Sequence, residues 1–271
     1  MNAVGAVIGR LFELRAGMAR VLHPRGIPMD AAARELHEQG VVMLPGRIPA
    51  DEIEELNRIN APYFSRTAPQ ELIYSPDGKE LREGDGAEDI DRFYFLHIKN
   101  YQEKVDVYPR VVVHVDSLLA SYYRSNFFVR DVYCYRSQPI QRVNGSYQWH
   151  VDNYPAGSLK VMVYLTDVGD EGGPLAFARG SHVNFRARLG SIGKRYDDDY
   201  VRARYPILEC FGKAGTVIIF NNNAIHRAVD PRQGIRDVVN FTVFPRVFGG
   251  RPGVRGLDLN AESSFLKKYT R

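Results

Sequence analysis

Two residues spaced two apart, His150 and Asp152, give the strongest chemical signal in the sequence. They lie in the stretch QWHVDNY, Gln148 to Tyr154. Side chains two residues apart on an extended chain point to the same face, so an imidazole nitrogen and a carboxylate oxygen can take adjacent positions around one metal ion. A third ligand must come from elsewhere, and His226, at the end of TVIIFNNNAIH, is the best candidate.

Two histidines and one carboxylate on one face of an octahedral metal are typical of non-haem Fe(II) oxygenases. Ten residues after His226, Arg236 opens the strand-like run RDVVNFTVF. A buried guanidinium can bind the far carboxylate of an oxo-acid through two parallel hydrogen bonds. Each element alone is a weak signal, because HxD pairs occur by chance. The ordered set of four predicts a metal site beside an oxo-acid site.

Four segments together resemble the phytanoyl-CoA dioxygenase-like (PhyH) family: QWHVDNY, VYLTDVGDEGGPLAFARGSH, GTVIIFNNNAIHRA and QGIRDVVNFTVF. The resemblance covers about residues 132–245 and implies a mainly β fold, a double-stranded β-helix (a jelly-roll or cupin-like barrel) with N-terminal helices packed outside. It also implies Fe(II), 2-oxoglutarate and O2 as cofactors, with ascorbate as a candidate reductant. His150, Asp152 and His226 match the family's iron ligands and would form the catalytic centre. Arg236 matches the arginine that binds the C5 carboxylate of 2-oxoglutarate.

The family resemblance implies an Fe(II)/2-oxoglutarate-dependent dioxygenase. Such an enzyme hydroxylates an unactivated carbon and converts 2-oxoglutarate to succinate and CO2. Related halogenases have a small residue in place of the carboxylate, so Asp152 favours hydroxylation or another oxidation. The chain departs from the family pattern at Ala228, where members often have serine two residues after the distal histidine. We expect Thr242 or Asn240, which share a strand face with Arg236, to supply the missing hydrogen bond.

Further residues are assigned to the pocket from strand alternation. In SLKVMVYLTDV, residues 158–168, Lys160, Met162, Tyr164 and Thr166 alternate with Leu159, Val161, Val163 and Leu165, which suits a barrel strand between a polar cavity and outer helices. We therefore expect Lys160, Tyr164 and Thr242 to bind the cosubstrate. The alternatives are a solvated strand end for Lys160 and a packed barrel aromatic for Tyr164. Gln148, Trp149 and Asn153, which flank the ligands, are candidate substrate contacts.

Two other residues could be mistaken for site residues. His182 follows a glycine and a serine at a turn, which favours a structural role. Arg232 rivals Arg236 as the carboxylate-binding residue, but it lies in the turn DPRQG, which favours a solvated side chain.

The composition is that of an ordinary globular protein: 44% hydrophobic and 25% charged residues, with a net charge of +4. No cluster of basic residues is dense enough to indicate nucleic-acid binding.

The two cysteines form no zinc or disulfide pattern, which favours a reducing cytoplasm. No apolar stretch is long enough to span a bilayer. The helix expected at Ala3–Leu22 is interpreted as one that packs outside the barrel or forms a subunit contact, and its basic amphipathic pattern leaves open a peripheral contact with an anionic membrane surface. The oligomeric state is open.

We expect a single oxygenase domain over residues 1–271. It comprises a mostly helical N-terminal region (1–125), a catalytic core (126–246) and a C-terminal tail (247–271). Helices are expected at 3–22, 29–39, 50–64 and 108–123. Strands are expected at 41–46, 92–98, 127–137, 158–168, 175–177, 215–220 and 237–244. Residues 67–91 are polar and rich in proline and glycine, which predicts a loop and a candidate lid, with a disordered segment as the alternative.

Two rival functions use the same residues: a non-catalytic metal- or ligand-binding barrel, and a metal hydrolase. Arg236 has no evident purpose in a hydrolase. The substrate is expected to be a small molecule. The basic residues Arg142, Lys160 and Arg179 make an anionic substrate plausible, and a lipid-linked or sugar-linked one is also open.

Overall fold

The computed structural model describes residues 29–64, 72–75, 95–98, 100–139, 145–152, 157–183 and 195–245. The predicted helix at 3–22, most of the predicted lid at 67–91, Asn153 and the tail at 247–271 lie outside this part of the chain. The membrane contact suggested for residues 3–22 therefore stays a prediction. Within the described part, no helix is both long enough and apolar enough to cross a bilayer.

A seven-stranded antiparallel sheet forms the framework of the molecule, with strand order β1-β8-β5-β10-β4-β3-β2. β10 lies at its centre between β4 and β5, and every residue of β10 is buried. The strands are β1 (Val41–Leu44), β2 (Leu72–Ser75), β3 (Phe95–Ile98), β4 (Phe127–Ser137), β5 (Leu159–Tyr164), β8 (Val217–Asn221) and β10 (Arg236–Pro245).

The two faces of this sheet have different chemistry, because side chains alternate along each strand. Leu159, Val161 and Val163 pack with apolar residues of the helices, whereas Met162 and Tyr164 belong to a separate cluster on the other face. This agrees with the predicted alternation along 158–168. The helices are α2 (Ala31–Gln39), α3 (Ala50–Asn60), α4 (Tyr101–Lys104), the π-helical turn η3 (Tyr108–Val112) and α5 (Val113–Tyr123).

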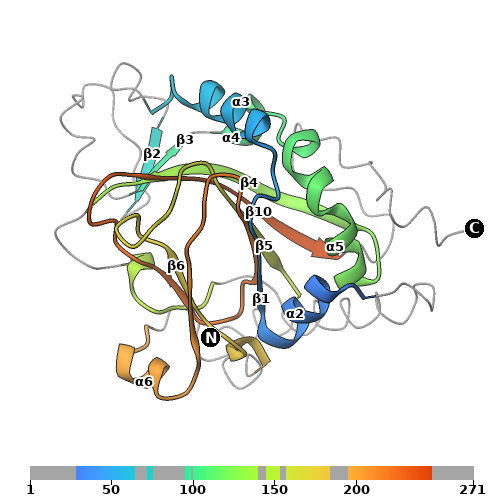
Figure 1. Ribbon diagram of the computed structural model, residues 1–271, viewed down its shortest axis with the longest axis vertical. Helices are drawn as coiled ribbons and strands as arrows, with labels where there is room; N and C mark the ends of the chain where they lie inside the picture. Colours follow the sequence, from blue (N-terminus) through green and yellow to red (C-terminus); the bar gives the residue numbers. More distant parts are fainter. Residues whose placement is uncertain are drawn as a thin grey trace, which may run out of the picture.

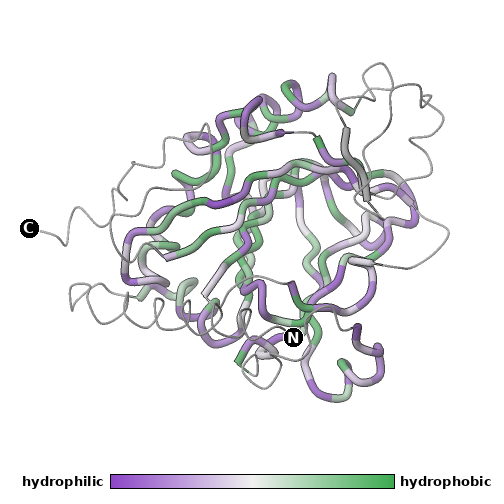
Figure 2. The backbone as a smooth tube through the Cα atoms, turned by 180° about the vertical axis from the view of Figure 1, so that it is seen from behind, coloured by the Kyte–Doolittle hydropathy of each residue, from purple (hydrophilic) through white to green (hydrophobic). Residues whose placement is uncertain are grey.

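A second, three-stranded antiparallel sheet lies across from the first, with strand order β7-β6-β9. Its strands are β6 (Leu175–Ala178), β7 (Ile207–Cys210) and β9 (His226–Ala228). In Figure 1, α3 and α5 lie to one side of the large sheet, with β6 and the short helix α6 (Asp198–Arg202) to the other. Figure 2 shows much of the hydrophobic colouring on the central strands. The site occupies the space between the two sheets.

The structure agrees with many of the predicted elements and corrects several. The strand at 127–137 matches β4, and Asp30 caps α2 by accepting a hydrogen bond from the backbone of Ala33. Leu72–Ser75, predicted as loop, is a strand. In the described part of residues 1–125, the strands β1, β2 and β3 join the large sheet beside the expected helices. A boundary at residue 125 therefore divides one continuous sheet. β7, β9 and α6 had not been predicted.

Candidate metal centre and cosubstrate pocket

His150, Asp152 and His226 converge although 74 residues separate Asp152 from His226. Each offers one ligand atom, and these atoms all lie within 4.8 Å of one another. Asp152 Oδ1 lies 3.5 Å from His150 Nε2 and 3.7 Å from His226 Nε2. All three side chains are largely buried. The three donors therefore surround a point that a single cation could occupy.

The two imidazoles are oriented by backbone carbonyl groups. His150 Nδ1 lies 2.8 Å from the carbonyl oxygen of Gln148, and His226 Nδ1 lies 3.0 Å from that of Ala224. A carbonyl oxygen can only accept a hydrogen bond, so each Nδ1 must carry the proton. Both Nε2 atoms are then free of protons and face Asp152. This tautomer is the one that a metal site requires.

The strands also hold the two histidines at a fixed separation. The backbone N–H of His150 donates to the carbonyl of His226 at 2.9 Å, and the N–H of His226 donates back to His150 at 3.0 Å. This antiparallel pair brings the ring centroids to 4.5 Å. The predicted extended conformation around His150 thus serves to pair it with the other histidine ligand.

The charges in the site suit metal binding. Burial raises the pKa of Asp152, but Lys160 and the imidazoles of His226 and His150 outweigh that effect and hold it well below its usual value. Burial, together with the nearby His150 ring and the charge of Lys160, lowers the pKa of His226 to about 3, although Asp152 opposes the shift. At neutral pH the carboxylate is ionised and His226 is neutral, which are the protonation states that ligands need.

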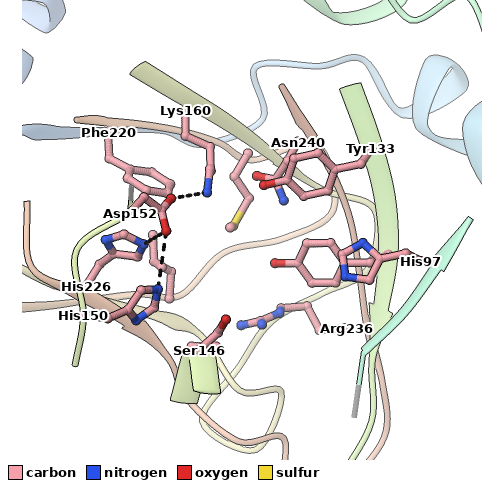
Figure 3. A pocket seen from close by; sticks show the side chains of 14 residues that line it. His97, Tyr133, Ser146, His150, Asp152, Lys160, Phe220, His226, Arg236 and Asn240 are labelled. Atoms are coloured by element: carbon pink, nitrogen blue, oxygen red, sulfur yellow. Dashed lines mark hydrogen bonds and ion pairs between the residues drawn. The ribbon is translucent and has the colours of Figure 1, made fainter. Parts of the chain in front are cut away.

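A cavity lies beside the three candidate ligands. Figure 3 shows the ligands on one side of it and Arg236, Tyr133, Asn240 and His97 on the other. Residues of both sheets line it: His97, Tyr133, Tyr135, Ser146, His150, Asp152, Lys160, Met162, Leu175, Phe220, His226, Ala228, Arg236 and Asn240.

Arg236 places a buried positive charge on the cavity wall. It is 1% exposed. One terminal nitrogen donates to the carbonyl of Gly173, the other donates to Ser137 Oγ at 3.1 Å, and Nε has no partner among the described residues. In the part of the chain that the structure describes, no carboxylate pairs with it. A buried guanidinium without a counter-charge is costly, so the wall is built to receive an anion such as a carboxylate. Together with the ligand set, this fits Fe(II) and 2-oxoglutarate.

Lys160 lines the cavity as predicted, but its nearest charged partner is Asp152, one of the three candidate metal ligands. Its Nζ lies 2.5 Å from Asp152 Oδ2 and 5.7 Å from the centre of the Phe220 ring. The ammonium group therefore holds the carboxylate oxygen that points away from the histidines. This leaves Oδ1 as the ligand atom.

Four other expected contacts do not fit the structure. The Tyr164 hydroxyl donates to the carbonyl of Cys210 and accepts from the N–H of Leu175, so it is already satisfied, away from the cavity lining. Thr242 pairs with Lys160 across the sheet, about 20 Å along β10 from Arg236 at roughly 3.3 Å per residue. Trp149 packs outside the cavity in a separate cluster. Gln148 is exposed and does not line it.

Several pocket residues were overlooked in the sequence. Tyr133 and Tyr135 stack with ring centroids 6.1 Å apart, and His97 packs against both. Tyr133 and Tyr135 alternate with the buried Val132 and Cys134 along β4. This period of two was the sequence signal that could have placed the two tyrosines on the cavity face. Ser137 lies opposite Arg236 in the β4–β10 register. Its hydroxyl, not that of Thr242, is the one beside the guanidinium.

His182 and Arg232, which the sequence did not favour as site residues, lie apart from the cavity lining. Arg232 is exposed. His182 Nε2 lies 3.1 Å from the carbonyl of His37, at the surface of the molecule. Both placements agree with the roles expected for them.

Comparison with known proteins identifies the family. The phytanoyl-CoA dioxygenase (PhyH) family model matches residues 36–232. The chain belongs to this family. Proteins of this family are oxygenases that depend on non-haem iron and 2-oxoglutarate, so this chain is an enzyme of that class. No curated protein sequence matches it closely enough to count as a relative.

Solved structures share the fold at low sequence identity. The non-haem, α-ketoglutarate-dependent carbocyclase SnoK from nogalamycin biosynthesis is 17% identical, with a TM-score of 0.62 over 86% of this chain and 91% of its own. EctD from S. alaskensis with bound Fe is 16% identical with a TM-score of 0.59, over 85% of each chain. HygX from Streptomyces hygroscopicus, solved with nickel, 2-oxoglutarate and hygromycin B, is 17% identical with a TM-score of 0.52, over 80% and 87%. These matches confirm the double-stranded β-helix.

The assignment of Tyr164 can be tested by Tyr164→Phe. Loss of the hydroxyl removes two buried hydrogen bonds, to the Cys210 carbonyl and from the Leu175 N–H, so the free energy of unfolding should fall by about 1–3 kcal/mol. The affinity for 2-oxoglutarate should not change. Urea unfolding and calorimetric titration measure the two quantities, with the exposed Tyr200→Phe as control. A large loss of 2-oxoglutarate affinity in a stable variant would restore Tyr164 to the cosubstrate site.

Proposed function

We propose that this enzyme hydroxylates a carbon of a small molecule, with His150, Asp152 and His226 as the iron ligands and Arg236 as the residue that binds 2-oxoglutarate. The observation that carries the proposal is the uncompensated guanidinium of Arg236 across the cavity from the three ligands. A metal hydrolase with the same ligands has no evident need for this buried cation, and release of succinate distinguishes the enzyme from a barrel that only binds an anion.

The protein's part in the reaction is to bind and to orient. Bound Fe(II) and 2-oxoglutarate supply the oxidising chemistry by decarboxylation of 2-oxoglutarate to succinate and CO2. His150, Asp152 and His226 leave the other coordination positions open. Arg236 and Ser137 hold the distal carboxylate of the cosubstrate, which fixes the position of 2-oxoglutarate in the cavity. Lys160 fixes Asp152, and Met162, Leu175 and Phe220 on the cavity wall exclude water.

The cavity wall opposite the iron ligands favours a neutral, ring-containing substrate. Burial, aided by the charge of Lys160, lowers the pKa of His97 to about 4, so this imidazole is uncharged at neutral pH. Tyr133 and Tyr135 present aromatic rings beside it. Asn240 is fully buried, and both polar atoms of its amide lack partners among the described residues. This wall suits a ring held by aromatic contacts, with a hydroxyl or amide group bound to Asn240.

The charges nearby support the same substrate class. Lys160 is paired with Asp152, and the proposal assigns Arg236 to the cosubstrate. Neither basic residue is then available to an anionic substrate, which weighs against the anionic molecule considered from composition. HygX, solved with hygromycin B, offers a ring-containing compound as an analogy at 17% identity. We propose a neutral cyclic metabolite that carries hydroxyl or amide groups.

The proposed activity predicts that the enzyme releases succinate from 2-oxoglutarate and that this release requires Fe(II). Anaerobically purified protein should be loaded with Fe(II), exposed to O2 and screened against neutral cyclic metabolites. Succinate and a product one oxygen heavier are detected by mass spectrometry. His226→Ala is the control and should be inactive, because one of the three ligands is missing. Succinate release that continues without iron, or with His226→Ala, would contradict the proposal.

Arg236→Ala tests the cosubstrate site. Without the guanidinium the distal carboxylate is buried unpaired, at a cost of about 3–5 kcal/mol, so affinity for 2-oxoglutarate should fall roughly 10²–10³-fold. Isothermal titration of the metal-loaded protein gives the dissociation constant. The matched control is Arg232→Ala, which removes the same charge from an exposed turn four residues earlier and should leave the affinity unchanged. Equal affinity in wild type and Arg236→Ala refutes this role.

Asn240→Leu tests the substrate wall. Leucine keeps the volume but removes a buried amide that has no partner, so stability should hold or rise. Substrate-coupled turnover should fall about 10–100-fold, equivalent to one or two lost hydrogen bonds to the substrate. Succinate release without substrate should not change. Thr242→Val, on the same strand face but outside the cavity lining, is the control. Unaltered coupled turnover in Asn240→Leu would remove Asn240 from the substrate site.

A further inference from the structure

Asp198 contacts the neighbours of both histidine ligands. It lies in α6, and its Oδ1 accepts a 2.9 Å hydrogen bond from the indole N–H of Trp149, the residue before His150. The same oxygen lies 3.3 Å from Nη1 of Arg227, the residue after His226. One carboxylate oxygen thus links the two chain segments that carry the imidazoles, on the side away from the cavity.

The strand geometry explains why these two neighbours meet. His150 and His226 are directly opposite in an antiparallel bridge. Stepping one residue back from His150 and one forward from His226 places Trp149 opposite Arg227, with both side chains on the reverse face. The Arg227 guanidinium accordingly lies 4.6 Å from the centre of the Trp149 ring. The cavity face holds the ligand pair, and the reverse face holds this second pair.

The environment of Asp198 is that of a fixed anion. Its other oxygen, Oδ2, accepts a 2.5 Å hydrogen bond from Arg202 Nε, one helical turn further along α6. The chain leading into α6 is itself tied to the same strand, because the backbone N–H of Tyr196 donates to the carbonyl of Trp149 at 3.0 Å. Trp149 is 1% exposed, so its indole N–H depends on Asp198 as a hydrogen-bond acceptor.

We propose that Asp198 is a positioning residue for the metal centre. It fixes Trp149 and Arg227 from behind, and these fix the strand pair that spaces the Nε2 atoms of His150 and His226. The bridge between the two histidines is short and has two mutual hydrogen bonds. Without Asp198, Trp149 and Arg227 lose their common anchor and the two segments can shift relative to each other. This inference rests on the proposed role of His150, Asp152 and His226 as metal ligands.

Titration with Co(II) tests the inference without a substrate, because the visible absorption of bound Co(II) reports both affinity and ligand geometry. Asp198→Ala should weaken Co(II) binding about 10-fold, the lower end of the range for residues that support metal ligands, and should change the band shape at saturation. Asp198→Asn should lie between wild type and Asp198→Ala, because its amide oxygen still accepts from Trp149 but carries no charge for Arg227. The matched control is Asp199→Asn, which removes an equal charge from the same helix end at an exposed position.

The outcomes separate this inference from the proposed function. Asp198→Ala with wild-type affinity and band shape would overturn the positioning role while the metal centre stands. Weaker binding with an unchanged band in all three variants, Asp199→Asn included, would show a general charge effect and would also overturn it. Wild-type protein that binds no Co(II), or binds as well after His226→Ala, would overturn both. If Asp198→Ala does not fold, Asp198→Asn against Asp199→Asn decides the question.

Discussion

Two backbone hydrogen bonds, exchanged between His150 and His226, are the contact on which the rest of the site depends. They join segments 76 residues apart and set the distance between the two imidazoles. Carbonyl groups two residues before each histidine then orient the rings, so that both Nε2 atoms face Asp152. The ligand geometry is therefore a property of paired backbone, which is more rigid than a set of ligands on separate loops would be.

The large sheet supplies the charges that this geometry needs. One face of β5 and β10 packs under the helices, and the other presents Lys160, Arg236 and Asn240 to the cavity. A buried charge is tolerated when it is paired, as Lys160 is with Asp152. Arg236 has hydrogen-bond acceptors but no described counter-charge. This imbalance is the structural basis for proposing that a dicarboxylate completes the site.

The sequence predicted the ligands and Arg236 because residue type and a period of two determine which groups share a face. The period of two does not show how far along the strand a residue lies from the site, or whether its polar group already has a hydrogen-bond partner. Tyr164 lies on the predicted face of β5, yet its hydroxyl is already hydrogen-bonded to a backbone carbonyl of the three-stranded sheet. Trp149 lies on the reverse face because it is adjacent to His150. The place of Ser137 beside Arg236 follows from the register of β4 and β10. The role proposed for Asp198 follows from its contact with Trp149, 49 residues away in sequence. No local pattern reveals either one.

The most direct test of the account is a crystal structure of the anaerobic protein with Fe(II) and 2-oxoglutarate. We predict one iron bound directly by the Nε2 atoms of His150 and His226 and by an Asp152 oxygen, at about 2 Å as for the same donors on zinc. We also predict the distal carboxylate of 2-oxoglutarate on the guanidinium of Arg236. Iron bound elsewhere, or a 2-oxoglutarate whose distal carboxylate lies away from Arg236, would contradict it.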